Sequence, residues 1–229
     1  MYIKICGITK LNQAIAIAKM GANALGFICA SSSPRYIQPQ AIAHIISNLQ
    51  SQLQHESPPF LPLPDFVGVF VNADIEQILQ TVSETGLTAI QLHGGESVSY
   101  CQELRSQLEQ TSQIPSSIKL IKALRIRDRQ SLEQAKIYQQ AVDILLLDAY
   151  DPHIEGGTGK TIDWQLLHDF HQEMHLDWWL AGGLSPDNVT EAIALTNPDG
   201  LDISSGVEIK AGDKDLAKVK QFLALASKA

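Results

Sequence analysis

Short runs of apolar and β-branched residues alternate with longer segments of helical period along the whole chain. Runs of the first kind are typical of buried strands, and segments of the second kind are typical of helices that pack on a sheet. We expect strands at residues 2–6, 24–29, 65–71, 89–93, 118–124, 143–148, 177–181 and 200–204. Helices should begin near Leu11, Pro39, Asp74, Glu96, Asp128, Ile162, Pro186 and Asp213. This alternation predicts βα units and a parallel sheet.

Eight strand-helix pairs in 229 residues match a (β/α)8 barrel, or TIM barrel, as one α/β domain over residues 1–229. A doubly wound open sheet is the rival architecture, and the hydrophobic pattern alone does not exclude it. The pattern is interrupted at residues 47–64, which are rich in Pro, Ser and Gln. We interpret that stretch as a surface loop between the second helix and the third strand.

Composition narrows the function classes. The chain has 45% hydrophobic residues, enough to bury a sizeable core, and its 17 basic and 25 acidic residues give a net charge of −8. This balance argues against nucleic-acid or anionic-membrane partners, which first attract a protein electrostatically. A small anionic ligand remains compatible with local groups. With no secretory signal, no long apolar span and three widely spaced cysteines, we expect a cytoplasmic protein.

In a (β/α)8 barrel the catalytic residues lie where the strands end and the βα loops begin. The expected strand ends here carry Cys6, Cys29, His93, Asp148, Gly182 and Ser204. Each one alone could be an ordinary small or hydrogen-bonded residue. Several of them converging on one face favour a site.

Cys6 shares a strand face with Lys4, because residues two apart in a strand point the same way. A lysine beneath a cysteine favours the thiolate and should lower the thiol pKa. The alternative, a buried cysteine acting as a small hydrophobic side chain, fits the strand pattern equally well.

Two aspartates are also candidates. Asp148 closes an apolar strand, where a carboxylate must be paired, hydrogen-bonded or protonated; a protonated one would suit a general acid. The alternative is an Asp that caps the following loop. Asp202 should point inward from the last strand, where an internal salt bridge to Lys4 or Lys122 is the favoured interpretation.

Two glycine-rich segments follow the seventh and eighth strands, at residues 181–189 and 204–208. A phosphate binds backbone N–H groups that no Cβ obstructs, and barrels commonly hold one after these two strands. Glycines serving only as turn residues are the alternative. The paired positions favour a phosphate site.

Two other patterns are rejected as sites. Residues 156–161, GGTGKT, resemble a P-loop, but Ile154 stands where the full spacing needs glycine. His168, His171 and His175 share one face of the expected sixth helix at a metal-like spacing. Because helices form the outer ring of a barrel, we interpret them as a solvated face and predict no metal site.

Eight blocks in order are similar to the phosphoribosylanthranilate isomerase family. They are KICGIT (4–9), GANALGF with SPRYI (21–37), VGVFVN (67–72), QLHG (91–94), LLLDAY (145–150), GGTGKTIDW (156–164), AGGLSPDNV (181–189) and DISSGVE with GDKD (202–215). The resemblance spans essentially the whole chain. It implies a (β/α)8 barrel that converts N-(5-phosphoribosyl)anthranilate to 1-(o-carboxyphenylamino)-1-deoxyribulose 5-phosphate, an Amadori rearrangement in tryptophan biosynthesis that needs no cofactor.

The resemblance also implies residue roles. Cys6 would be the general base and Asp148 the general acid. Arg35 would bind the anthranilate carboxylate, with His93 and Asp202 orienting the substrate. The phosphate would be held by Gly182, Gly183, Ser204, Ser205 and Gly206. The unusually long stretch at 47–64 departs from the family pattern at the bottom face, so either a monomer or a homodimer is expected.

Two other functions stay open. The histidine-pathway aminoaldose isomerase performs the same rearrangement on another aglycone, but its family carries aspartate where Cys6 stands. A non-catalytic barrel that binds phosphorylated ligands would keep the glycine loops and lose the chemistry. Cys6 and Asp148 both argue against that alternative.

Overall fold

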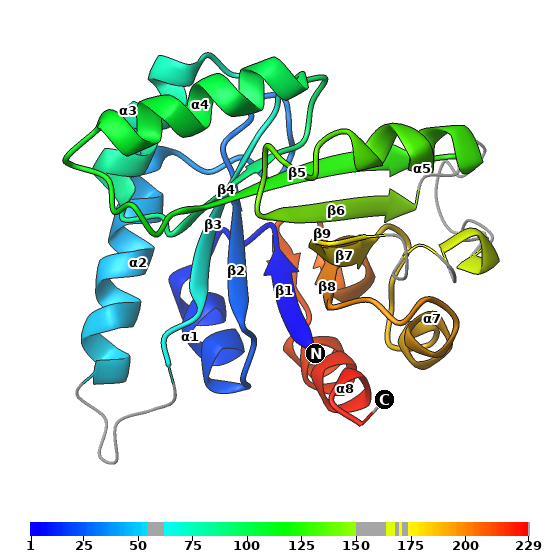
Figure 1. The fold of residues 1–229 in the computed structure, drawn as a ribbon. Coiled ribbons are helices and arrows are strands. Elements are labelled where there is room, and N and C mark those ends of the chain that lie inside the picture. Colours follow the sequence, from blue (N-terminus) through cyan, green and yellow to red (C-terminus); the bar gives the residue numbers. More distant parts are fainter. Residues whose placement is uncertain (55–61, 150–163, 168–169, 171–173, 229) are drawn as a thin grey trace.

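The computed structural model describes residues 1–229 except 55–61, 150–163, 168–169, 171–173 and 229. Eight parallel strands form a closed barrel in which each strand pairs with the next and β8 pairs with β1 (Figure 1). They are β1 (Tyr2–Cys6), β2 (Ala24–Ile28), β3 (Asp65–Phe70), β4 (Ala89–Leu92), β5 (Lys119–Ile126), β6 (Ile144–Ala149), β7 (Asp177–Ala181) and β8 (Gly200–Ile203). The β8–β1 pairing confirms the barrel and excludes the open sheet.

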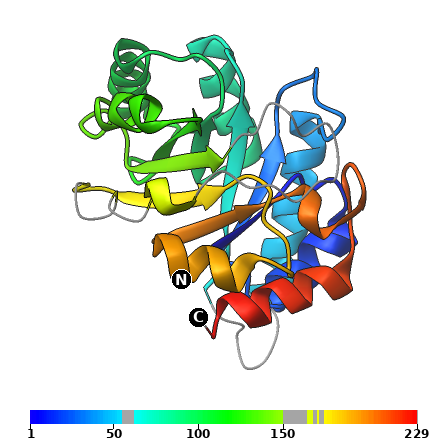
Figure 2. The same cartoon turned by 90° about the vertical axis from the view of Figure 1, so that its right-hand side faces the viewer.

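Helices follow the strands and cover the outside of the barrel (Figures 1 and 2). They are α1 (Leu11–Lys19), α2 (Pro39–Gln54), α3 (Ile75–Thr85), α4 (Val98–Gln110), α5 (Arg129–Lys136), α7 (Val189–Thr196) and α8 (Leu216–Ala226), with short 3-10 turns η1 (Trp164–Leu167) and η2 (Ser205–Val207). Beyond η1, much of the expected sixth helix lies outside the described residues. The N-terminus lies close to the end of α8 in both views.

Local sequence explains several helix ends. Asp128 accepts a hydrogen bond from the Ser131 backbone, and Ser131 reciprocates, so α5 begins with a capping box. The Asp215 carboxylate caps the first turn of α8 by accepting hydrogen bonds from the backbone N–H groups of Ala217 and Lys218. Gly86 ends α3 in the left-handed region at φ 78°, which glycine adopts without strain.

Two expectations need correction. Residues 47–54 are not loop, because α2 continues to Gln54 and buries Leu49 and Leu53 in the core; residues 55–61 lie outside the described part of the chain. The last helix begins at Leu216 rather than near Asp213, because the chain first forms a small antiparallel hairpin of β9 (Glu208–Lys210) and β10 (Asp213–Lys214). This hairpin places Glu208 and Lys214 at one end of the barrel.

The barrel interior is filled by alternate strand residues. Its apolar cluster comprises Ala24, Val67, Ala89, Ile121, Ala123, Ile144, Leu146, Trp179 and Ala181. At the N-terminal end, Tyr2 stacks on Trp179 with ring centroids 4.8 Å apart. The next inward positions of β1 are Lys4 and Cys6. The inward side chains of this strand are therefore aromatic at the N-terminal end of the barrel and polar at the C-terminal end, which we call the mouth. Among the described residues, no helix combines the length and apolar character of a membrane span.

Candidate active site

The closed parallel barrel brings the predicted site residues to one end. Cys6 ends β1, Asp148 lies near the end of β6, and His93 and Ser204 directly follow β4 and β8. Arg35 comes from the segment after β2, where Tyr36 bridges to Ile28. The C-terminal strand ends therefore form a polar mouth over an apolar interior, as the strand parity predicts.

Cys6 lies buried against a glycine of the neighbouring strand. Its Cα is in register with that of Gly26, and a Cβ at Gly26 would lie 2.7 Å from Cys6 Sγ and 3.0 Å from Lys4 Cε. Burial raises the pKa of the Cys6 thiol, and the neighbouring Lys4 charge only partly opposes this. Lys4 is thus where the sequence predicted it, and its charge lowers the thiol pKa as expected, but the loss of hydration raises that pKa by more.

Beneath Cys6, Lys4 forms an ion pair with Asp202. Lys4 Nζ lies 2.9 Å from Asp202 Oδ1, with side chains 0% and 9% exposed. Burial lowers the pKa of Lys4, but Asp202 and then Cys6 outweigh it, so the pKa is raised and the cation is retained. Asp202 therefore makes the internal salt bridge favoured from sequence, and its partner is Lys4. The other candidate, Lys122, pairs with Glu96 at 2.8 Å.

Asp148 and His93 meet across the mouth. His93 Nε2 lies 3.4 Å from Asp148 Oδ2, and each side chain is about a quarter exposed (25% and 24%). The other ring nitrogen, Nδ1, lies 3.0 Å from Nε2 of Gln91, a fully buried residue of β4. Gln91 was not singled out from sequence, because only the fold shows that it touches a site residue.

Arg35 is held by a carboxylate from the β9–β10 hairpin. Its Nε lies 2.9 and 3.1 Å from the Glu208 oxygens and its Nη2 lies 2.6 Å from Oε2. Burial raises the pKa of Glu208, but hydrogen bonds from Arg35 and Lys214 outweigh it and hold that pKa below its usual value. Lys214 Nζ, fully buried, donates to Glu208 at 2.9 Å and to the Ser204 carbonyl at 3.2 Å. Glu208 and Lys214 lie within the family-like motifs, but the sequence pattern does not mark them as site residues.

The residues predicted to bind phosphate lie on two adjoining loops. Gly182 and Gly183 have φ values of 86° and 64°, which residues with a side chain rarely adopt. Gly206, in η2, packs so closely on the Leu184 backbone carbonyl that a Cβ there would collide with it. The loops after β7 and β8, with Ser204 and Ser205, therefore meet backbone to backbone.

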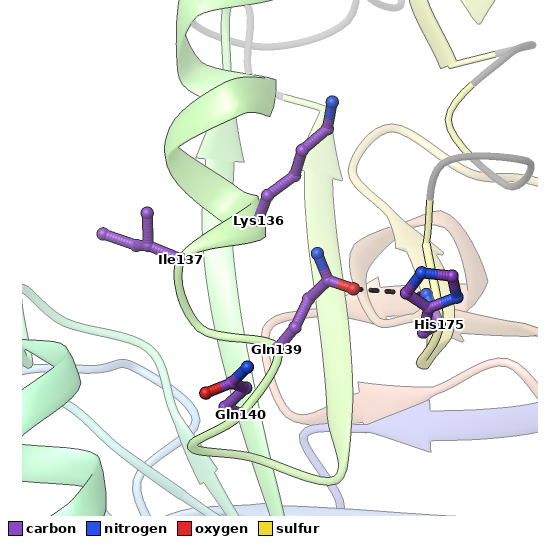
Figure 3. A pocket seen from close by; sticks show the side chains of 5 residues that line it. All are labelled: Lys136, Ile137, Gln139, Gln140 and His175. Atoms are coloured by element: carbon purple, nitrogen blue, oxygen red, sulfur yellow. Dashed lines mark hydrogen bonds between the residues drawn. The ribbon is translucent and has the colours of Figure 1, made fainter.

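Of the other sequence candidates, Cys29 directly follows β2 at the same end of the barrel, and the rest lie elsewhere or outside the described residues. Cys29 Sγ lies 3.7 Å from the Phe27 carbonyl, and burial raises its pKa to about 12. The P-loop-like segment 156–161 and both His168 and His171 are not described. Figure 3 shows His175 in a surface depression with residues from the end of α5. That depression lies where β6 and β7 begin, so it is remote from the polar mouth. The described residues hold no His, Cys, Asp or Glu group arranged for a metal.

Comparisons with known proteins agree with this architecture. The family model described as N-(5'phosphoribosyl)anthranilate (PRA) isomerase matches residues 3–224. The chain is 50% identical to N-(5'-phosphoribosyl)anthranilate isomerase of Trichormus variabilis, over 96% of this chain and 95% of that one. The solved Thermotoga maritima phosphoribosyl anthranilate isomerase is 33% identical with a TM-score of 0.84, covering all of both chains.

A further solved phosphoribosyl anthranilate isomerase was crystallised with reduced 1-(o-carboxyphenylamino)-1-deoxyribulose 5-phosphate. It is 32% identical to this chain, with a TM-score of 0.80 and complete coverage of both chains. Because the family model covers nearly the whole sequence and the relatives match end to end, the chain belongs to the N-(5'-phosphoribosyl)anthranilate isomerase family.

Proposed function

We propose that this chain isomerises N-(5-phosphoribosyl)anthranilate to 1-(o-carboxyphenylamino)-1-deoxyribulose 5-phosphate in tryptophan biosynthesis, with Cys6 as general base and Asp148 as general acid. The observation that carries the assignment is the order of strands around the mouth. Strands β7 and β8, with their adjoining glycine loops, separate β6, which carries Asp148, from β1, which carries Cys6. A sugar phosphate anchored on those loops can therefore meet an acid on one side and a base on the other.

In the proposed reaction, Asp148 protonates the furanose ring oxygen. The C1′–O bond then breaks, and the anthranilate nitrogen lone pair forms an iminium. The Cys6 thiolate removes the C2′ proton, which gives an enolamine that tautomerises to the C2′ ketone. Because burial raises the pKa of Cys6, few molecules hold the thiolate at neutral pH, but that thiolate is a strong base. Lys4 limits the cost of forming it.

The binding groups follow from the same geometry. Among the described residues, Glu208 engages Nε and Nη2 of Arg35, which leaves Nη1 of the guanidinium for the anthranilate carboxylate. Gly182, Gly183, Ser204, Ser205 and Gly206 hold the phosphate. His93 orients Asp148 at the reacting end. Asp202 orients the substrate, with its Oδ1 engaged by Lys4 beneath Cys6.

We also propose that the chain works as one barrel domain, as a monomer or homodimer, in the cytoplasm and without a cofactor, metal, nucleic acid or membrane partner. The closed barrel supports the single domain. The net charge of −8 opposes polyanion binding, and the three free cysteines suit a reducing compartment.

The test follows the loss of the substrate's anthranilate fluorescence when purified protein is added to freshly generated phosphoribosylanthranilate. We expect turnover by wild type and its loss in Cys6→Ala and in Asp148→Asn. Cys101→Ala, in buried α4, and Asp74→Asn, an exposed residue whose side chain makes no cap bond to α3, are matched controls that should keep turnover. Circular dichroism establishes that each variant is folded.

An inactive wild type would contradict the proposal. Binding of phosphorylated ligands by that inactive protein would then favour the non-catalytic barrel.

A further inference from the structure

A buried amide in the barrel contacts the site through His93. Gln91 lies on β4 two residues before His93, with no exposed surface, and its Nε2 lies 3.0 Å from His93 Nδ1. The opposite ring nitrogen, Nε2, lies 3.4 Å from Asp148 Oδ2. That second distance is long for a hydrogen bond, as is common at catalytic groups before substrate binds. Gln91, His93 and Asp148 therefore form a line from inside the barrel to its mouth.

The amide restricts the protonation of the ring. An amide NH2 can only donate, so Nδ1 must present a lone pair, and the ring proton then sits on Nε2, facing Asp148. An imidazolium carries a proton on Nδ1 as well, which would face the amide hydrogens. This orientation of Gln91 therefore favours the tautomer with its proton on Nε2.

The orientation leaves a buried polar atom unpaired. Gln91 Oε1 is buried and has no hydrogen-bond partner among the described residues. Turning the amide would instead bring Oε1 to Nδ1, where it would accept an Nδ1 proton. Unpaired buried polar groups are rare in native proteins, and a functional constraint is one explanation for them.

Such a constraint exists at Asp148, if it is the general acid of the proposed function. A cationic imidazolium beside Asp148 would favour the carboxylate and keep the acid without its proton. A neutral imidazole that donates from Nε2 to Oδ2 leaves Oδ1 to carry the transferable proton. It also stabilises the carboxylate formed after proton transfer.

We propose that Gln91 is a positioning residue, which fixes His93 as the neutral Nε2–H tautomer and thereby keeps Asp148 competent as the general acid. Gln91 itself does not touch the substrate. The other charged groups around the mouth are Arg125, the register partner of Asp148 on β5, the Lys4–Asp202 pair next to Cys6 and the Arg35–Glu208–Lys214 cluster. The Lys122–Glu96 pair also lies nearby, because Lys122 donates to the Leu92 and Gly94 carbonyls on either side of His93. None of these is changed in the variants below.

The tautomer can be measured directly by nitrogen NMR of protein labelled at histidine, with the His93 signals assigned by their loss in His93→Asn. In wild type at neutral pH we expect a protonated Nε2 and an unprotonated Nδ1. In Gln91→Glu the carboxylate should accept a proton from Nδ1 and shift the ring toward Nδ1–H or imidazolium. In Gln91→Leu, of similar size, the preference for Nε2–H should weaken.

Kinetics supply the second readout. Both Gln91 variants should lower kcat about 10- to 100-fold, as loss of an orienting outer partner commonly does, with little change in KM. Signals of the other six histidines report whether the fold is retained. If Gln91→Leu fails to fold, wild type and Gln91→Glu still decide the outcome.

A wild-type ring protonated on Nδ1, or the same tautomer in wild type and in Gln91→Glu, would overturn the proposal. Because the NMR readout needs no turnover, it separates this failure from failure of the proposed reaction. An inactive wild type with a neutral Nε2–H ring would contradict the isomerase assignment and leave the positioning of His93 intact.

Discussion

Gly26 faces Cys6 across the β1–β2 pair, and the absence of a side chain at Gly26 makes the space that the Cys6 sulfur occupies. A Cβ at Gly26 would lie 2.7 Å from Sγ, closer than real Cβ contacts, and 3.0 Å from Lys4 Cε, tighter than most of them. The thiol and its supporting lysine therefore pack together against one neutral backbone position. This relationship makes Gly26 a determinant of where the proposed base points.

Gly26→Ala should displace the Cys6 sulfur while leaving the strand paired, because alanine suits an extended backbone. A shift of about 1 Å in a reacting group can lower the rate about 100-fold, and we expect a loss of that order in kcat/KM. The measurement is steady-state fluorescence kinetics, together with thermal unfolding. Gly95→Ala is the matched control, since among the described residues its added Cβ meets only Asn72 Oδ1, at an ordinary contact distance of 3.7 Å. Full activity in Gly26→Ala would show that the sulfur position is not limiting.

Lys4→Met should move the acid limb of the kcat/KM profile to higher pH. The base must be a thiolate, so activity rises as pH rises through the thiol pKa. Burial raises that pKa and Lys4 lowers it, so removing the lysine raises it further. The pH dependence of kcat/KM reports the free enzyme and is the quantity to compare with wild type. An unchanged acid limb of the pH profile in folded protein would show that Lys4 does not influence the pKa of Cys6.

The same substitution should destabilise the barrel, because it leaves the Asp202 carboxylate buried without its cation. Breaking one side of a buried pair typically costs about 3–5 kcal/mol. Lys4→Met combined with Asp202→Asn should recover much of this loss, since no charge is then stranded. Urea unfolding of the two variants and wild type measures the difference. Equal stability of the single and double variants would contradict a buried, charged Asp202.

Glu208 should contribute stability that acid removes. Because Arg35 and Lys214 hold the pKa of Glu208 below its usual value of 4.5, the contribution is present above that value and is lost as pH falls through the lower, folded-state pKa. Glu208→Gln should be less stable than wild type near neutral pH, because it leaves Lys214 buried without a carboxylate partner. It should also lose less stability than wild type on acidification. Urea unfolding across this range is the measurement. The exposed Glu133→Gln, which breaks a surface pair with Lys136, is the control and should follow wild type.

Strand periodicity together with the expected barrel places Lys4, Cys6 and Asp202 on inward faces. Residues two apart share a face, and the alternate apolar residues face the helices. It could not predict that the carboxylate nearest Arg35 is Glu208, 173 residues later, because the β9–β10 hairpin has no strong pattern of its own. Nor could it show that burial outweighs Lys4 at the thiol, since that balance depends on how much water reaches Sγ. Gly26 and Gln91 carry no chemical signal in sequence; register and contact reveal them.

Gly206→Ala should weaken phosphate binding more than it slows chemistry. At Gly206 the loop after β8 rests on the Leu184 carbonyl of the loop after β7, and an added Cβ would collide with that backbone oxygen. A backbone carbonyl cannot move away as a flexible side chain can, so the two loops must separate. The N–H groups that would surround a phosphate then no longer point to one position. We expect a raised KM and weaker inhibition by inorganic phosphate, with a smaller change in kcat. Kinetics with phosphate as competitor measure both effects, with Gly95→Ala again as control. A lowered kcat at unchanged KM would place the importance of Gly206 in the chemical step and contradict a phosphate site on these loops.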